Sequence, residues 1–201
     1  MRSLPVNQRT RILLIQAGAL ALAPIFFLAQ PVWDEGTHEL VEMAGLAFVL
    51  VCVAGRMWSI LYVGSKKNHE LVTRGPYSIT RNPLYFFSTI GAVGVGLIYG
   101  SLAVALALGL LAYLVFIITA TKESEYLSTV FGASYDAYAR QTPMFWPSPS
   151  RYQDEPEVTF SPKALKRTLL NGLLFLAAFP LIETVEYLQA AGYLPILMRI
   201  F

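Results

Sequence analysis

Long apolar runs separated by short polar segments dominate the chain. Five runs approach the length of a membrane-crossing helix, and they cover residues 12–32, 42–63, 85–99, 101–121 and 168–190. A span requires about 20 helical residues at a rise of about 1.5 Å per residue. The pattern therefore predicts an all-α, polytopic membrane helix bundle with about five transmembrane helices, which form a single domain over residues 1–201.

The composition supports this prediction. The chain has 201 residues, of which 55% are hydrophobic and 14% are charged. Its formal net charge of +2 is too small to suggest a nucleic-acid partner. Cys52, the single cysteine, cannot form an internal disulfide, and the chain has no Cys/His cluster of the kind that binds zinc. We therefore expect a bilayer protein without a metal site, in which Cys52 is a packing or lipid-facing residue.

The first apolar run follows three arginines, Arg2, Arg9 and Arg11, an arrangement that also occurs in signal peptides. The run continues to Val32 with no small-x-small pattern to close a short core, so it predicts a retained helix. Pro24 lies inside this helix and removes a backbone donor, which predicts a kink.

The placement of lysine and arginine predicts the orientation. Basic residues occur in the N-terminal arm, in residues 64–84 and in residues 122–167, whereas residues 33–42 are acidic and the hairpin tip at residues 99–101 is uncharged. Cytoplasmic loops carry the excess of Lys and Arg. We therefore expect the N-terminus and both other basic segments on the cytoplasmic side. The C-terminus lies outside if the fifth run crosses fully.

The third and fourth runs predict an antiparallel hairpin because the turn between them is very short. Gly96 and Gly100 form a GxxxG pair, which permits close backbone approach in membrane helices. A nucleotide-binding glycine loop would need a strand before it and a helix after it, and neither is predicted, so we reject a dinucleotide-binding fold.

The fourth run is too long for the membrane alone. Residues 101–131 predict a helix of about 45 Å, against a hydrocarbon core of about 30 Å, so its last turns project into the cytoplasm. Gly132 is placed to end this helix in a left-handed conformation. A short helix over residues 133–140 would then bring Tyr135 and Tyr138 together.

The C-terminal third begins with a linker. Residues 141–165 are rich in proline, serine and acidic residues, which predicts a segment that crosses the cytoplasmic face. In the fifth run, Pro180 predicts a break or a re-entry. Glu183 and Glu186 either pair with Arg199 or lie at the outer interface.

The first polar cluster precedes the hairpin. Asn82 and Pro83 suit the start of a helix, with Asn82 as the N-cap and Pro83 in the first turn. Under that interpretation, Arg81 and Tyr85 are interface anchors. The turn at residues 75–77, Gly-Pro-Tyr, would pack its backbone against the start of this helix. This arrangement favours a binding site instead.

The second cluster follows the hairpin. Glu123 shares a helix face with Leu127 and Phe131, whereas Glu125 points elsewhere. A carboxylate on a packing face needs a cationic or N–H partner, and Arg81 or a cationic ligand could supply it. The alternative is a solvated carboxylate at a helix end.

Two further residues could take part in chemistry. Arg56 lies within an apolar run, about 10 Å from its cytoplasmic end, where it either serves a function or extends its charge to the interface. His69 could act as an acid or base near neutral pH, or be ordinary polar surface.

These clusters together resemble the isoprenylcysteine carboxyl methyltransferase family and its phospholipid methyltransferase relatives. The matching motifs, within residues 50–147, are Gly55-Arg56-x-Trp58, Arg81-Asn82-Pro83-x-Tyr85 before a hydrophobic hairpin, Glu123, and Phe131-Gly132-x-x-Tyr135-x-x-Tyr138. Residues 1–49 would add an N-terminal helix region, and residues 148–201 a linker and a membrane helix. Asn82 stands where the family often has histidine, and Ser124 where it often has a second glutamate.

The resemblance implies a transferase in the cytoplasmic membrane of a bacterium, with S-adenosylmethionine bound at the cytoplasmic end of the bundle. The cofactor-binding candidates are His69, Leu71, Val72, Gly75, Tyr77, Arg81, Asn82, Pro83, Tyr85 and Glu123. The catalytic candidates are Arg56, Arg81 and Glu123. Arg81 suits the cofactor's carboxylate, Glu123 its ammonium group, and Arg56 an anionic acceptor group.

The expected acceptor is a membrane-embedded lipid or isoprenoid with a carboxylate, phosphate or amine head. Two other functions stay open at this point. Membrane sterol and isoprenoid double-bond reductases share a similar C-terminal pattern and use a nicotinamide cofactor, although they usually have more helices. A non-catalytic membrane scaffold with the same fold is the other alternative.

Overall fold

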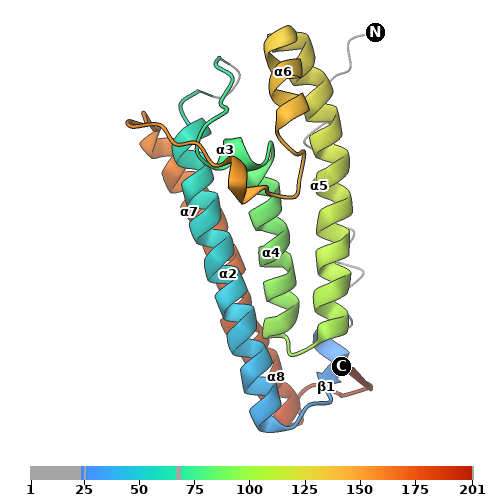
Figure 1. The fold of residues 1–201 in the computed structure, drawn as a ribbon. Helices are drawn as coiled ribbons and strands as arrows, with labels where there is room; N and C mark the ends of the chain where they lie inside the picture. The colour runs from blue at the N-terminus through green and yellow to red at the C-terminus, as the bar shows by residue number, and fades with distance from the viewer. Residues whose placement is uncertain (1–23, 25, 67–68, 201) are drawn as a thin grey trace.

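The structure is a computed structural model, and it describes residues 24, 26–66 and 69–200. Helices dominate it (Figure 1). In chain order the elements are β1 (Ala29–Pro31), α2 (Glu35–Val63), α3 (Pro76–Ile79), α4 (Pro83–Ile98), α5 (Leu102–Phe131), α6 (Ala133–Gln141), η1 (Pro149–Arg151), α7 (Pro162–Leu176), α8 (Ala178–Ala190) and β2 (Met198–Ile200).

The predicted fold class, an all-α membrane bundle, is confirmed. Three helical stretches of the described chain are long and apolar enough to cross a bilayer: α2, α5, and α7 together with α8. The fourth, α4, has 16 residues, which gives about 24 Å of helix and falls short of a typical hydrocarbon core. The first predicted span lies largely outside the described residues, and its last part, residues 29–31, is a strand rather than helix.

The fifth predicted span is also not one regular helix. It begins earlier than predicted, at Pro162, and breaks at Ala177 between α7 and α8. The break lies three residues before Pro180, as expected for a residue that cannot donate to the preceding turn. Beyond α8, β2 pairs in parallel with β1, and Ala29 lies opposite Met198.

Close backbone contact joins α2 to α4. A Cβ atom added at Gly45 would lie 2.4 Å from the backbone nitrogen of Ile98 and 2.7 Å from the carbonyl oxygen of Gly94. The two glycines of the predicted GxxxG pair do not share one helix contact. Gly96 packs against Ala105 of α5, whereas Gly100 lies in the turn with a φ of 74° and faces His38.

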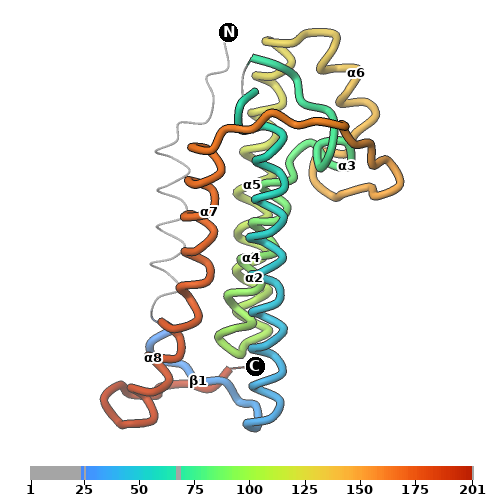
Figure 2. The backbone as a smooth tube through the Cα atoms, turned by 90° about the vertical axis from the view of Figure 1, so that its left-hand side faces the viewer, coloured from blue at the N-terminus to red at the C-terminus, as the bar shows by residue number. Residues whose placement is uncertain are grey.

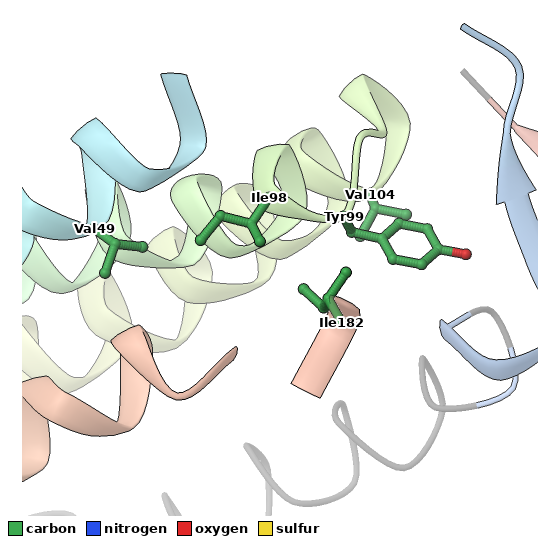
Figure 3. Packing of buried hydrophobic residues seen from close by; sticks show 5 residues of the cluster. All are labelled: Val49, Ile98, Tyr99, Val104 and Ile182. Atoms are coloured by element: carbon green, nitrogen blue, oxygen red, sulfur yellow. The ribbon is translucent and has the colours of Figure 1, made fainter. Parts of the chain in front are cut away.

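The buried apolar cluster lies toward the end of the bundle that holds the α4–α5 turn. Figure 3 shows Val49, Ile98, Tyr99, Val104 and Ile182 gathered there from α2, α4, α5 and α8. The Tyr99 hydroxyl donates to the carbonyl oxygen of Ala29 at 2.7 Å, which ties β1 to the hairpin.

The opposite end holds α3, α6 and the loops (Figures 1 and 2). We call residues 142–161 the crossing segment, because they run over this end from α6 to α7 (Figure 2). Backbone hydrogen bonds fix the crossing segment to the loop before α4: Ser148 donates to Ile79 at 2.9 Å, and Gly75 donates to Gln153 at 2.8 Å. The two predicted polar clusters therefore meet at one end of the bundle.

Candidate active site

A cavity of about 390 Å³ opens at the end of the bundle that holds α3 and α6. Its walls come from α2, the loop before α3, α4, α5, α6 and α7. Helices α2 and α5 lie on either side of α4 (Figure 1). Arg56, Arg81 and Glu123, the three catalytic candidates, all line this cavity.

One wall comes from Leu71 and Val72 in the loop before α3 and from Tyr77 in α3 itself. Burial raises the pKa of the Tyr77 hydroxyl well above its usual value, so this side chain stays neutral. Gly75 has a φ of 60°, and a Cβ atom there would meet the Tyr62 ring at 2.3 Å. The backbone can therefore pass this point only without a side chain.

Arg81 enters the cavity from the turn before α4. Its Nη1 donates to Ser124 Oγ at 3.2 Å and to the Tyr135 hydroxyl at 3.4 Å. The Tyr135 hydroxyl in turn donates to Ser124 Oγ at 2.9 Å. Arg81 is thus held by neutral hydroxyls from α5 and α6.

Glu123 enters the cavity from α5. The Tyr85 hydroxyl donates to Glu123 Oε2 at 2.9 Å, and the Tyr85 ring stacks on Phe116 with ring centroids 5.0 Å apart. Glu125 is exposed on another face of α5, as predicted. Glu123 is therefore a partly buried carboxylate, and a tyrosine rather than Arg81 is its partner.

Arg56 lies deeper, within α2. Its Nη1 donates to Ser88 Oγ on α4, and Ser88 donates in turn to the Leu84 carbonyl oxygen at 2.6 Å. Among the described residues, the buried Nε atoms of Arg56 and Arg81 have no hydrogen-bond partner. Within the same part of the chain, no ion pair joins Arg56, Arg81 or Glu123 to another side chain.

Asn82 and Pro83 line the cavity at the start of α4. Pro83 occupies the first turn, as predicted, but the Asn82 side chain makes no capping hydrogen bond. Instead, its Nδ2 donates to the Met144 carbonyl oxygen at 2.9 Å. Asn82 thus fixes the crossing segment, because an accessible carbonyl competes with the helix N-terminus for this side chain.

Helix α6 closes the cavity through Tyr138. Gly132 precedes α6 with a φ of 56°, which is positive as expected, although its ψ of −133° lies outside the left-handed helical region. Tyr138 donates to the Tyr77 carbonyl oxygen at 2.7 Å. Burial raises the pKa of Tyr138, so this hydroxyl stays a donor. Tyr135 and Tyr138 lie together, as predicted, with ring centroids 6.0 Å apart.

Two of the predicted cofactor residues lie outside the cavity. His69 is exposed and is not part of the cavity lining. Gly75 is buried against Tyr62 and shapes the wall only through the backbone. In contrast, sequence reasoning did not identify Glu70, Ser88 or Thr168, which do line the cavity. No local sequence pattern pointed to Thr168, because it belongs to α7, which is remote in sequence from the other residues that line the cavity.

No group of three or more His, Cys, Asp or Glu side chains in the described residues is arranged to hold a metal ion. The charged groups that line the cavity are two guanidinium groups, Arg56 and Arg81, and two carboxylates, Glu70 and Glu123. Such a cavity can hold a zwitterion, with its anionic end at a guanidinium and its cationic end at a carboxylate.

The chain matches known proteins over this region. The model of the phospholipid methyltransferase family matches residues 42–134. The chain is 34% identical to the cobalt-zinc-cadmium resistance protein CzcN of Cupriavidus metallidurans, over 81% of this chain and 75% of that protein. It is also 34% identical to the nickel-cobalt-cadmium resistance protein NccN of Alcaligenes xylosoxydans, over 81% of this chain and 76% of that protein.

Methyltransferases are also among the relatives. A protein-S-isoprenylcysteine O-methyltransferase of Schizosaccharomyces pombe is 36% identical over 45% of this chain and 39% of its own length. No solved structure matches the chain. The family match covers most of α2, residues 64–82, α4, α5 and the start of α6. These segments contribute most of the residues that line the cavity. The chain therefore belongs to the phospholipid methyltransferase and isoprenylcysteine carboxyl methyltransferase family of membrane proteins.

Proposed function

We propose that this protein transfers a methyl group from S-adenosylmethionine to a membrane-embedded lipid or isoprenoid acceptor. One observation carries the proposal: Arg81, in the turn before α4, and Glu123, in α5, line the same cavity, and neither forms an ion pair with a described residue. The amino-acid part of S-adenosylmethionine carries one carboxylate and one ammonium group. These two charges match the two side chains.

The residues present fit this cofactor. The Nε atom of Arg81 is buried without a hydrogen-bond partner in the described residues, so it can donate to a carboxylate. Glu123 would bind the ammonium group, while Tyr85 fixes one of its oxygens at 2.9 Å. When bound, the cofactor supplies an electrophilic methyl group on a sulfonium. The chain's contribution is to hold both reactants in line, since positioning lowers the barrier of a two-reactant step.

The acceptor would meet the methyl group on the side of Arg56. Arg56 lies farther into the membrane region than Arg81, and its guanidinium can bind an anionic head. An ionised carboxylate or phosphate needs no general base, whereas an amine must lose a proton. His69 is exposed and lies outside the cavity lining, so Glu70 and Glu123 are better placed to take that proton.

The names of the two bacterial relatives refer to metal resistance and state no reaction. The acceptor class therefore rests on the cavity and on the relatives that are named as methyltransferases. Family membership favours a methyltransferase over a nicotinamide-dependent reductase. A scaffold with this fold would have no need of charged side chains without ion partners in an accessible cavity.

Binding of radiolabelled S-adenosylmethionine to the purified protein tests the proposal. We expect saturable binding in detergent or lipid nanodiscs, and no comparable binding of NADPH. Incubation with a lipid extract, followed by mass spectrometry, should reveal a product heavier by one methylene unit. Binding of NADPH alone would support the reductase, and binding of neither cofactor would support the scaffold.

We also propose that the cavity faces the cytoplasm, with the N-terminus on the same side. Residues 69–84 and the crossing segment lie at one end of the bundle, joined by backbone hydrogen bonds. The sequence around this end is rich in lysine and arginine, with Lys66, Lys67, Arg74 and Arg81 before α4 and Arg151, Lys163, Lys166 and Arg167 around the start of α7. Single cysteines at positions 66 and 150, in a background without Cys52, should be labelled from the same cytoplasmic side. Labelling of the two positions from opposite sides would contradict the topology.

A further inference from the structure

Thr168 lines the cavity from α7 and is only 8% exposed. A threonine within a helix can donate its hydroxyl to the carbonyl oxygen four residues earlier, as Thr119 does at 2.7 Å and Thr184 does at 2.6 Å. The Thr168 hydroxyl, by contrast, forms no hydrogen bond with the described residues. Because buried hydroxyls normally have a partner, a ligand in the cavity is the partner that this one lacks.

The packing of α7 on α2 gives the depth of Thr168 in the bundle. A Cβ atom added at Gly64 would lie 3.1 Å from Ala164 Cβ, and one added at Gly172 would lie 3.3 Å from Val53 Cγ2. The two helices therefore run antiparallel. Thr168 lies midway between these two contacts along α7, and the part of α2 opposite it is the part between the same contacts.

Arg56 belongs to that part of α2 and lines the same cavity. Its Nε atom is buried and has no hydrogen-bond partner among the described residues. Glu123 lies in α5, on the other side of α4 from α2 (Figure 1). The side of the cavity that α2 and α7 form therefore offers two donors, a guanidinium N–H and a hydroxyl, and an anionic oxygen head can accept from both.

The cavity-lining residues that the structure describes leave no group free to take a proton from an acceptor. Glu70 pairs with Lys66 at 3.6 Å. Glu123 accepts from a tyrosine hydroxyl and would bind the ammonium group of the cofactor. Burial raises the pKa of Tyr77 and that of Tyr138, so both hydroxyls keep their protons. An amine acceptor must lose a proton, whereas an oxygen anion requires no base.

We propose that Thr168 determines acceptor specificity, because its hydroxyl donates to an acceptor head that is already ionised at oxygen, as a carboxylate or a phosphate. This inference rests on the proposed function and narrows its acceptor class. A lone pair of the oxygen forms the bond to the methyl carbon, and the carbon–sulfur bond breaks with its electron pair left on sulfur. The acceptor loses one negative charge, the sulfonium becomes a neutral thioether, and no proton moves. Thr168 lies outside residues 42–134, which the family model matches.

The chemical stability of the product tests the acceptor class. The wild-type protein in lipid nanodiscs is incubated with a bacterial total lipid extract and with S-adenosylmethionine that carries a radiolabelled methyl group. A methyl ester of a carboxylate or phosphate releases the label as volatile methanol in mild alkali, whereas a methyl group on nitrogen stays in the non-volatile fraction. We expect the label to be released, and mass spectrometry of the intact product then separates a methyl carboxylate from a methyl phosphate. Label that resists alkali would overturn the inference and leave methyl transfer itself intact.

Thr168→Val tests the hydroxyl, because valine keeps the branched shape and removes the donor. We expect the apparent KM for the same lipid extract to rise about three- to tenfold, as for the loss of one hydrogen bond, with an unchanged Kd for S-adenosylmethionine. Thr168→Ser restores a hydroxyl and should recover most of this loss. Thr119→Val is the matched control, because Thr119 is also 8% exposed, lies outside the cavity lining and bonds within its own helix.

The variants and the wild type fail in different ways. An unchanged KM in Thr168→Val would overturn the role of Thr168. A rise in the Kd for S-adenosylmethionine equal to the rise in KM would also overturn it, because a change confined to acceptor binding leaves cofactor affinity intact. If Thr168→Val does not fold, Thr168→Ala carries the same comparison. If the wild type neither bound S-adenosylmethionine nor transferred label, the proposed function itself would fail.

Discussion

The two ends of the bundle treat charged side chains differently. At the end with the α4–α5 turn, a hollow of about 280 Å³ is lined by His38 and Glu186, whose Nε2 and Oε2 atoms lie 3.5 Å apart and form an ion pair when His38 is protonated. At the other end, Glu70 at the rim of the larger cavity pairs with Lys66 at 3.6 Å, whereas Arg81 and Glu123 line the same cavity and bind hydroxyls. Side chains that already pair with each other have less charge to offer a ligand, whereas charges held by neutral groups remain available to one.

The two ends of the bundle also differ in their apolar packing. The buried cluster that includes Ile98 and Tyr99 fills the end with the α4–α5 turn (Figure 3). The cavity end is closed instead by polar contacts between the crossing segment and the loop, such as Arg81 N to the Pro143 carbonyl oxygen at 2.9 Å. The end with the α4–α5 turn therefore contributes mainly to stability, whereas the cavity end mainly positions the side chains that line the cavity.

Removal of either ligand-facing charge should have the largest effect. We expect Arg81→Ala or Glu123→Ala to weaken S-adenosylmethionine binding by about 2–5 kcal/mol, because one end of the zwitterion would be left desolvated and unpaired. Calorimetry on the purified protein measures this change. His38→Ala, at the opposite end, is the control and should lower thermal stability with unchanged affinity. Wild-type affinity in both cavity variants would remove these assignments.

Arg56→Leu should separate the acceptor from the cofactor. The change removes a charged donor from Ser88 and from the acceptor side of the cavity. We expect kcat/KM for the lipid acceptor to fall by about ten- to a hundredfold, since hydrogen bonds to charged groups contribute about 1.5–3 kcal/mol. The Kd for S-adenosylmethionine should stay nearly unchanged. Full turnover, or a joint loss of folding and cofactor binding, would indicate that Arg56 only extends to the interface or supports the fold.

Gly45→Ala should damage stability without affecting ligand affinity. The added methyl group would lie 2.4 Å from the backbone nitrogen of Ile98, and a backbone atom cannot move aside easily. Overpacking of this kind costs about 1–3 kcal/mol. Thermal unfolding in detergent measures the loss. Gly36→Ala is the matched control in the same helix, because its methyl group would meet only Asp34 Oδ2, at 3.6 Å. Equal stability of the two variants would show that α2 and α4 can separate at no cost.

The fold was largely predictable from local patterns. Hydropathy located α2, α4 and α5, and the position of Gly132 predicted the end of α5 within one residue. The strand pair of β1 and β2 was not predictable, because each strand has three residues and their partners lie far apart in the chain. The extent of the fifth span was wrong, since Ser161 caps α7 well before the apolar run begins.

The residues that line the candidate site were predictable where charge and helix geometry act locally. Arg81 and Glu123 were identified from their positions at the two ends of the hairpin, and both line the cavity. Their partners were not, because the contact of Arg81 with Ser124 depends on how α5 and α6 pack. His69 was named for its titratable side chain and for the family resemblance; it is exposed and outside the cavity lining, so its part in cofactor binding stays a prediction.

Asp154→Asn should produce the smallest effect, because Asp154 is exposed. The Tyr62 hydroxyl donates to Asp154 Oδ1, and this hydrogen bond holds the pKa of Asp154 below its usual value. A carboxyl group with a depressed folded-state pKa stabilises the fold above its unfolded pKa of about 3.9, and the contribution disappears as the pH falls through the folded value.

We therefore expect Asp154→Asn to lower the Tm slightly at pH 7, with the difference shrinking as the pH falls below about 4. Thermal unfolding of both proteins across this pH range measures the difference, and taking the difference removes the titration of the shared acidic groups. Glu157→Gln changes another exposed acid of the crossing segment and serves as the control. A Tm difference that stays constant from pH 7 down to pH 2 would show that the charge of Asp154 does not hold the crossing segment to α2.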